Sequence, residues 1–362
     1  MRSSPHLAAL GCIFLLTIAY VLIDLCGVFS INYSAQLPGS LTSIVEEKNT
    51  FKERPLLNKA LFDKKMLALA NNPPPPVSAS SSTSTPPITY LWPAKAVDPL
   101  GDALLPFNRI VSYYGNFYST KMGVLGEYPE DVMLGMLQAE VDKWEAADPE
   151  TPVIPAIHYI AITAQGSPGE DGKYRLRMPD SQIDHALELA KKIDGIVFLD
   201  LQVGLSDFQT EIPIFEKYLK LPNVHLGLDP EFSMKERGKP GIVIGTMDAT
   251  DINYATEYLA KLVNEHNLPP KILVIHRFTG NMVTNYKNIV TRPETQIVMD
   301  MDGWGPPANK ITTYRAFVSP EPVQFTGFKL FYKNDLKAPS TGLMTPEELL
   351  KLRPRPIYIQ YQ

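Results

Sequence analysis

Hydrophobic residues recur from Arg109 to the end of the sequence in short runs, separated by polar loops and longer amphipathic stretches. Eight of these runs are rich in β-branched and aromatic residues and almost continuously apolar. Parallel strands that are covered by helices have this character. The eight runs are Arg109–Tyr114, Val153–Ile160, Gly195–Leu201, Val224–Leu228, Lys271–His276, Gln296–Met301, Phe325–Phe331 and Pro356–Gln360.

Helical periodicity fills the intervals between the predicted strands. Pro129–Ala147 and Thr250–Asn264 each carry an apolar stripe at helical spacing. Ser181 is placed to cap a third helix, and Thr345 opens a capping-box sequence. Eight such alternations predict an α/β fold, a (β/α)8 TIM barrel over residues 106–362, with an open doubly wound sheet as the alternative.

The N-terminal segment has the pattern of a membrane anchor. Leu7–Ile31 is apolar apart from Asp24 and is long enough to span a membrane. Arg2 precedes it, which favours a cytoplasmic N-terminus. We expect an uncleaved signal anchor (a transmembrane helix) over residues 1–31, with cleavage after Ser30 or lipidation as alternatives. The barrel is then extracytoplasmic, at the cell surface or in the periplasm, and secreted if the segment is cleaved.

Residues 32–105 have the composition of a linker. Pro73–Pro76 and Ser78–Thr85 are typical of polyproline and flexible coil, so we predict a Pro/Ser/Thr-rich, largely disordered tether. Pro55–Ala70 alone has helical periodicity and predicts a short amphipathic helix. That helix either packs on the barrel, where no helix follows the eighth strand, or stays apart from it.

Composition excludes several classes of protein. The 362-residue chain has a formal net charge of -5 and no long basic run, so no nucleic-acid partner is expected. Both cysteines, Cys12 and Cys26, lie in the N-terminal apolar run, which excludes a disulfide framework or a cysteine zinc site in the barrel. Because phosphate-loop, dinucleotide-binding and serine-elbow motifs are absent from the sequence, we expect no cofactor.

Polar residues gather at the predicted strand ends, which meet at one face of a barrel where catalytic groups of this fold lie. Each one alone has an ordinary structural explanation, such as a loop cap or a satisfied core histidine. Together they predict a ligand-binding mouth, because buried charges are costly unless they are paired. The inward-facing set is Tyr114, His158, Asp200, Gln202, Asp229, Glu231, His276, Asp300, Asp302, Lys329, Tyr358 and Gln360.

The chemistry that this set favours is glycoside hydrolysis, which needs one carboxyl group that donates a proton and one that is ionised. Glu231 is the predicted acid, and Asp229 would orient it or raise its pKa by like charge. Asp300 or Asp302 would be the second carboxylate. The predicted substrate-binding residues are Tyr114, His158, Asp200, Gln202, His276, Arg277, Trp304 and Tyr358, whose aromatic members suit the faces of sugar rings.

Three short segments resemble the chitinase-like glycosidase family, and the resemblance implies a glycosidase-like (β/α)8 barrel. Gln202 stands where that family has its proton donor, so the resemblance does not imply substrate-assisted chitinase chemistry. Asp229-Pro230-Glu231 restores an Asp-x-Glu on the next strand. The similar segments are Asp194-Gly195-Ile196 with Asp200-Leu201-Gln202, Ser112-Tyr113-Tyr114-Gly115, and Met299-Asp300-Met301-Asp302.

The sequence thus predicts a membrane-tethered glycoside-hydrolase-like protein that acts on an envelope or extracellular polysaccharide. Two alternatives stay open. The mouth could bind a glycan without cleaving it, since the seventh predicted strand carries no carboxylate. It could also hold a divalent metal ion of a hydrolase, although the main prediction includes no metal. The ligands would come from His158, Asp200, Asp229, His276 and Asp300.

Overall fold

The computed structural model of the protein describes residues 53–74, 89–235 and 238–362. The predicted anchor at residues 1–31 lies outside these ranges, as do residues 32–52 and 75–88 of the predicted Pro/Ser/Thr-rich linker. Within them, no helix combines the length and the apolar character needed to cross a membrane.

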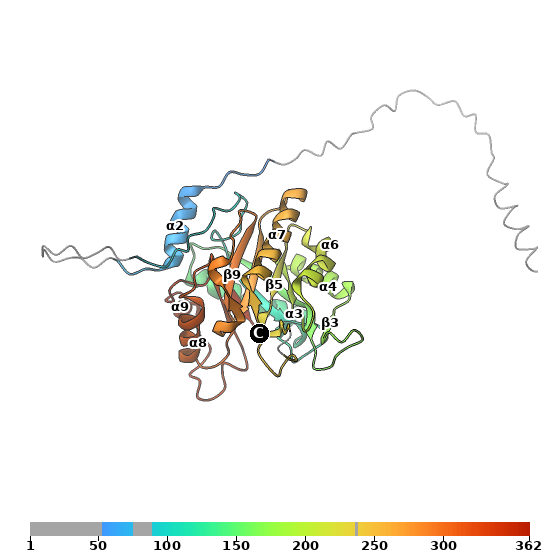
Figure 1. The fold of residues 1–362 in the computed structure, drawn as a ribbon. Helices are drawn as coiled ribbons and strands as arrows, with labels where there is room; N and C mark the ends of the chain where they lie inside the picture. The colour runs from blue at the N-terminus through green and yellow to red at the C-terminus, as the bar shows by residue number, and fades with distance from the viewer. Residues whose placement is uncertain (1–52, 75–88, 236–237) are drawn as a thin grey trace, which may run out of the picture. The chain divides into compact units, whose positions relative to one another are not determined.

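Eight parallel strands form a closed barrel (Figure 1). The first strand pairs with both the second and the last, so no open edge remains between them. This closure confirms the predicted barrel and excludes the open doubly wound sheet, and all eight predicted strands are present. The strands are β1 (Arg109–Gly115), β2 (Val153–Ala164), β4 (Ile196–Leu201), β5 (Val224–Leu228), β7 (Lys271–Arg277), β9 (Thr295–Met301), β10 (Phe325–Leu330) and β11 (Tyr358–Tyr361).

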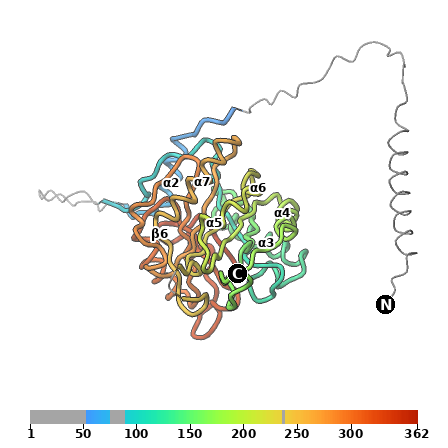
Figure 2. Tube along the Cα trace, turned by 45° about the vertical axis from the view of Figure 1, so that its right-hand side comes forward, coloured from blue at the N-terminus to red at the C-terminus, as the bar shows by residue number. Residues whose placement is uncertain are grey.

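Helices lie outside the barrel, and α3, α4 and α6 follow one another around one side of it in Figure 2. Short strands extend the loops: β3 (Arg175–Arg177) runs antiparallel to β2, and β6 (Met247–Asp248) pairs with β8 (Val283–Thr284). The helices around the barrel are α3 (Glu130–Ala147), α4 (Asp180–Lys192), α5 (Phe208–Glu211), α6 (Glu216–Leu219), α7 (Ala249–His266), α8 (Pro307–Thr313) and α9 (Pro346–Leu349).

Helix starts follow local capping chemistry. The predicted capping box at Thr345 is present, and a second box joins Asp248 to Asp251 at the start of α7. The predicted cap at Ser181 is wrong. Helix α4 begins at Asp180, two residues before the start that a cap at Ser181 implies, and it follows Pro179, whose backbone is extended and whose side chain makes no capping hydrogen bond.

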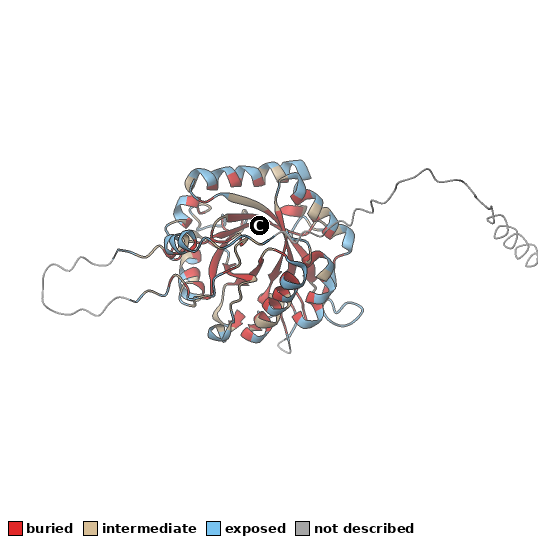
Figure 3. Cartoon of the chain, turned by 90° about the horizontal axis from the view of Figure 1, so that it is seen from above, coloured by how far each residue is buried: buried red, intermediate tan, exposed pale blue. Residues whose placement is uncertain are grey.

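Alternating strand residues pack in two environments. Outward-facing side chains such as Val111 and Leu199 pack against the helices in the main core. Inward-facing side chains at the amino ends of the strands, including Phe198 and Val274, form a second apolar cluster inside the barrel. Seen from above, the buried strands lie inside a ring of helices whose outer faces are exposed (Figure 3).

Helix α2 (Lys59–Ala70) closes the end of the barrel away from the carboxyl ends of the strands (Figure 1). Its Phe62 and Met66 join the inner apolar cluster, and the backbone N–H of Arg355 donates to the Leu69 carbonyl at 2.7 Å. The predicted amphipathic helix therefore exists and packs on the barrel. The barrel and α2 belong to one compact unit, which therefore begins well before residue 106.

Truncating Phe62 tests this closure. Phe62 is 7% exposed, whereas Leu67 on the same helix is 63% exposed. Phe62→Ala should lower the free energy of unfolding by about 3 kcal/mol, because it leaves a cavity under the barrel. The matched variant Leu67→Ala should change it by less than about 0.5 kcal/mol. Equal effects in denaturant titrations would mean that α2 does not contribute to the core.

Candidate functional site

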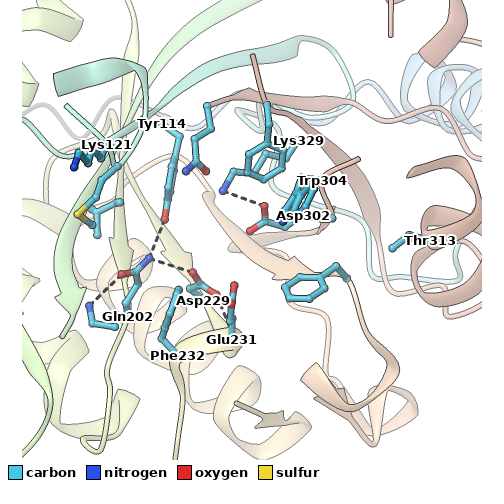
Figure 4. A pocket seen from close by; sticks show the side chains of 17 residues that line it. Tyr114, Lys121, Gln202, Asp229, Glu231, Phe232, Asp302, Trp304, Thr313 and Lys329 are labelled. Carbon is cyan, nitrogen blue, oxygen red and sulfur yellow. Dashed lines mark hydrogen bonds and ion pairs between the residues drawn. The ribbon is translucent and has the colours of Figure 1, made fainter. Parts of the chain in front are cut away.

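The carboxyl ends of the strands surround a cavity of about 440 Å³ (Figure 4). Six predicted site residues line it: Tyr114, Gln202, Asp229, Glu231, Asp302 and Trp304. Apolar side chains complete the wall, among them Phe232, Phe278 and Phe331. A cavity of this size, with apolar walls and a few convergent polar groups, is typical of a small-ligand site.

A tight turn after β5 positions the two acids of that strand. Asp229 Oδ1 accepts a hydrogen bond from the backbone N–H of Glu231 at 3.0 Å, and so caps the turn Pro230–Phe232. Asp229 Oδ2 accepts from Gln202 Nε2 at 3.3 Å. Asp229 is thereby fixed to the barrel, while Glu231 is half-buried with its carboxyl group directed into the cavity (Figure 4).

Asp302 enters the same cavity from the end of β9. Its Oδ1 lies 3.0 Å from Lys329 Nζ and its Oδ2 lies 3.1 Å from His276 Nδ1. The Lys329 ammonium group also lies over the Tyr114 ring, 3.8 Å from its centroid. Lys329 is a site residue that the sequence-based set of substrate-binding residues omitted, although its inward parity on β10 marks it as a barrel-interior side chain.

The environment separates the pKa values of the two cavity carboxyls. Burial, reinforced by the charge of Asp302, raises the pKa of Glu231 to about 7. Burial acts in the same direction on Asp302, but the charges and bonds of Lys329 and His276 outweigh it and lower the Asp302 pKa below its ordinary value. Near neutral pH, Glu231 retains a proton for part of the time while Asp302 is ionised.

Asp229 is held differently from both. Burial raises its pKa well above the ordinary value, and the charges of Asp200, Glu231 and Asp302 add to the effect. A neutral Asp229 is consistent with its place among other acids, because neighbouring carboxylates disfavour a further negative charge.

A fully buried cluster lies behind the cavity wall, centred on Asp200. The Tyr114 hydroxyl donates to Asp200 Oδ2 at 2.8 Å. The Nε2 atoms of His158 and His276 each lie 3.3 Å from Asp200 Oδ1. Among the described residues, His158, Asp200 and His276 form the group whose possible metal-ligand atoms all lie within 4.8 Å of one another, which is close enough to hold a metal ion.

Burial and charge divide the protonation of the cluster. Burial lowers the pKa of His158 to about 4, so this imidazole is neutral. For His276, burial acts in the same direction but is outweighed by Asp200 and by the bonds to Asp300 and Asp302, and the pKa is raised. Burial tends to raise the pKa of Asp200, yet the two histidines lower it overall. Asp200 is therefore an ionised carboxylate inside the barrel.

The remaining interior residues support this cluster. The hydroxyl group of Tyr358 lies 2.6 Å from His158 Nδ1, and Gln360 Nε2 donates to that hydroxyl at 2.8 Å. Asp300 Oδ2 lies 3.5 Å from His276 Nδ1, and burial raises the Asp300 pKa. His158, Asp200, His276, Asp300 and Tyr358 thus gather as predicted, but behind the cavity wall and not along it.

Two glycines make room for these acids. In the strand register Asp200 pairs with Gly227, and Asp300 pairs with Gly327. A Cβ atom at Gly227 would lie 2.5 Å from Asp200 Oδ1 and 2.4 Å from His158 Nε2. One at Gly327 would lie 2.5 Å from Asp300 Oδ1. Both contacts are too short, so the cluster requires a residue without a side chain beside each acid.

Two predicted substrate-binding residues are placed differently from the rest. Arg277 does not join the mouth. Its guanidinium group binds Glu321 and donates to the Gly280 carbonyl at 3.0 Å. Its neighbour His276 points inward, so strand alternation turns Arg277 outward. Trp304 lies at the rim and is 60% exposed.

No protein-family model matches the chain, and no curated protein matches it. Among solved structures, Bacillus subtilis mannanase man26 is similar at 12% identity and a TM-score of 0.38, over 71% of this chain and 80% of that one. A ruminal GH26 endo-β-1,4-mannanase is similar at 13% identity and a TM-score of 0.32, over 70% of this chain and 58% of that one.

Burkholderia cenocepacia dihydropteroate synthase is similar at 12% identity and a TM-score of 0.31, over 71% of this chain and 86% of that one. The assignment of the fold to this chain depends on its own strand pairing.

Substituting Gly227 tests the packing of the acidic cluster. Gly227→Ala should lower the free energy of unfolding by about 2 kcal/mol or more, because the new methyl group overlaps His158 and Asp200. Gly135→Ala on α3 is the control: no atom lies within 4 Å of its Cβ position, so a gain of roughly 0.5 kcal/mol is expected. A Gly227→Ala protein as stable as the wild type in urea titrations would contradict the close packing.

Proposed function

We propose that the protein is a glycoside hydrolase in which Glu231 is the general acid and Asp302 is the ionised carboxylate. The observation that carries this proposal is the pair itself: two carboxyl groups line one cavity, and their surroundings shift their pKa values in opposite directions. Such a separation is how two carboxyls take the acid and the ionised roles in glycoside hydrolysis.

Each residue has a role in the proposed reaction. Glu231 protonates the glycosidic oxygen of the leaving group. Asp302, paired with Lys329 and His276, stabilises positive charge at the sugar carbon or activates water there. Asp229 fixes the backbone of the turn that carries Glu231. This division of roles leaves Asp229 out of proton transfer.

The wall of the cavity supports a carbohydrate substrate. Trp304 at the rim and Phe278 and Phe331 within offer flat apolar faces next to carboxylates and Lys329. Sugar rings have apolar C–H faces that stack on aromatic side chains and hydroxyl groups that bond to charged ones. We further propose that the substrate is an envelope or extracellular polysaccharide, because the apolar N-terminal run of the sequence would tether the barrel outside the cytoplasm.

Replacing the acid tests the proposal. Glu231→Gln should lower the rate of reducing-end release by about 100-fold to 10,000-fold while glycan binding is retained, because the amide cannot donate the proton. Glu257→Gln, an exposed position on α7, should match the wild type. Full-length protein would be assayed on polysaccharides of differing sugar and linkage. Binding without release of reducing ends from any of them would instead identify a non-catalytic glycan-binding barrel.

The pH profile gives an independent test. A general acid must be protonated, so kcat/KM should be high below pH 7 and should fall above it, with a midpoint at about 7. Because the charge of Asp302 helps to raise the Glu231 pKa, Asp302→Asn should move this titration to lower pH. The shift is measured by ¹³C NMR of the Glu231 carboxyl group, whatever activity the variant keeps. If kcat/KM fell only above pH 9, or if the Glu231 titration were unchanged in Asp302→Asn, Glu231 would not be the general acid.

A further inference from the structure

Two histidines and an aspartate meet behind the cavity wall without hydrogen bonds among their facing atoms. His158 Nε2, His276 Nε2 and Asp200 Oδ1 are all fully buried. Each imidazole faces the carboxylate within ion-pair distance, at 3.3 Å, and none of the three atoms makes a hydrogen bond within the described part of the chain. Because buried polar atoms without hydrogen bonds are costly, this point of the barrel favours a bound ligand.

We propose that His158, Asp200 and His276 bind one divalent transition-metal ion, and that zinc is the ion best suited to this donor set. Two imidazoles and one carboxylate are nitrogen and oxygen ligands of the type that zinc takes in proteins. The site shares none of its three ligands with the Glu231–Asp302 pair, although His276 contacts Asp302 through its other ring nitrogen at 3.1 Å, and metal binding can be tested without hydrolysis.

The spacing of the donor atoms supports the ion. Each imidazole Nε2 lies 3.3 Å from Asp200 Oδ1, longer than a charge-assisted hydrogen bond, which is typically about 2.8 Å. In a tetrahedral site with metal–ligand bonds of about 2.0 Å, neighbouring ligand atoms are separated by roughly 3.3 Å. The two separations therefore match edges of a metal tetrahedron.

The other ring nitrogens are held as those of metal-bound histidines usually are. His276 Nδ1 faces Asp302 Oδ2 at 3.1 Å, which makes a carboxylate–histidine pair. His158 Nδ1 faces the Tyr358 hydroxyl at 2.6 Å. For both Nε2 lone pairs to face the ion, each ring would carry a proton on Nδ1, and the ion would replace any proton on His276 Nε2. Gly227 keeps the adjacent space clear, since a Cβ there would lie 2.4 Å from His158 Nε2.

The ion would fix the polar side of the cavity. Asp200 Oδ2 accepts from Tyr114, and the Tyr114 hydroxyl in turn accepts from Gln202 Nε2 at 3.2 Å. Gln202 also bonds to Asp229, which holds the turn that carries Glu231. A metal ion on Asp200 Oδ1 would therefore restrain this hydrogen-bonded series of side chains. The role of the ion would be to position the groups that line the cavity.

Metal content tests the proposal directly. Full-length protein stripped with a chelator and then dialysed against Zn²⁺ should retain one equivalent, measured by plasma mass spectrometry. Asp200→Asn and His276→Gln, which keep side-chain volume, should weaken Zn²⁺ binding by about 100-fold or more. His225→Gln is the matched control, because His225 is equally buried in the barrel but lies outside the three-residue group. It should retain the metal.

A measurement on the wild type alone guards against variants that do not fold. Loading with Co²⁺ should produce intense visible absorption typical of four-coordinate cobalt and two shifted, exchangeable imidazole N–H signals in the proton NMR spectrum. The proposal would be overturned if the wild type retained less than about 0.1 equivalent of Zn²⁺, roughly the background of adventitious binding. It would also be overturned if folded His225→Gln lost as much Zn²⁺ as Asp200→Asn. Metal that both cluster variants keep would overturn it too, because that metal would occupy another site.

Discussion

The ionised carboxylate of Asp200 inside the barrel is the constraint on which the rest of the site depends. A charge at a fully buried position is tolerated only with close compensation, and here Tyr114, His158 and His276 all face it. Those partners need their own partners: Tyr358 for His158, and Asp302 with Lys329 for His276. The polar network thus grows outward from one buried charge until it reaches the cavity.

The barrel divides this polar network from an apolar support. At the amino ends of the strands the interior is hydrophobic and α2 covers it, whereas at the carboxyl ends the interior consists of acids, histidines and tyrosines. Burying apolar surface stabilises the first half, and the second half carries groups whose burial opposes folding. The separation lets the barrel keep an electrostatically demanding site because its stability is supplied at the other end.

Periodicity was sufficient to predict the strands, because parallel strands buried on both faces are almost continuously apolar. Inward parity then predicted the residues that gather, from Tyr114 on β1 to Gln360 on β11. The same parity excludes Arg277 from the barrel interior. Its prediction as a substrate-binding residue followed only from its neighbour His276. Depth along the strand was not predictable: His158 and Asp200 lie behind the wall while Gln202 and Asp302 line it. That difference depends on barrel stagger and side-chain packing, as does the docking of α2.

The pairing of Gly227 with Asp200 and of Gly327 with Asp300 has an evolutionary consequence. The interior volume at each level of the barrel is shared between neighbouring strands, so one strand can carry a bulky acid only while the other carries hydrogen alone. Positions 200 and 227 are therefore expected to covary among descendants of this chain, as are positions 300 and 327. A lineage that lost the acid would be free to fill the space with an aliphatic side chain, and its glycine would no longer be under selection.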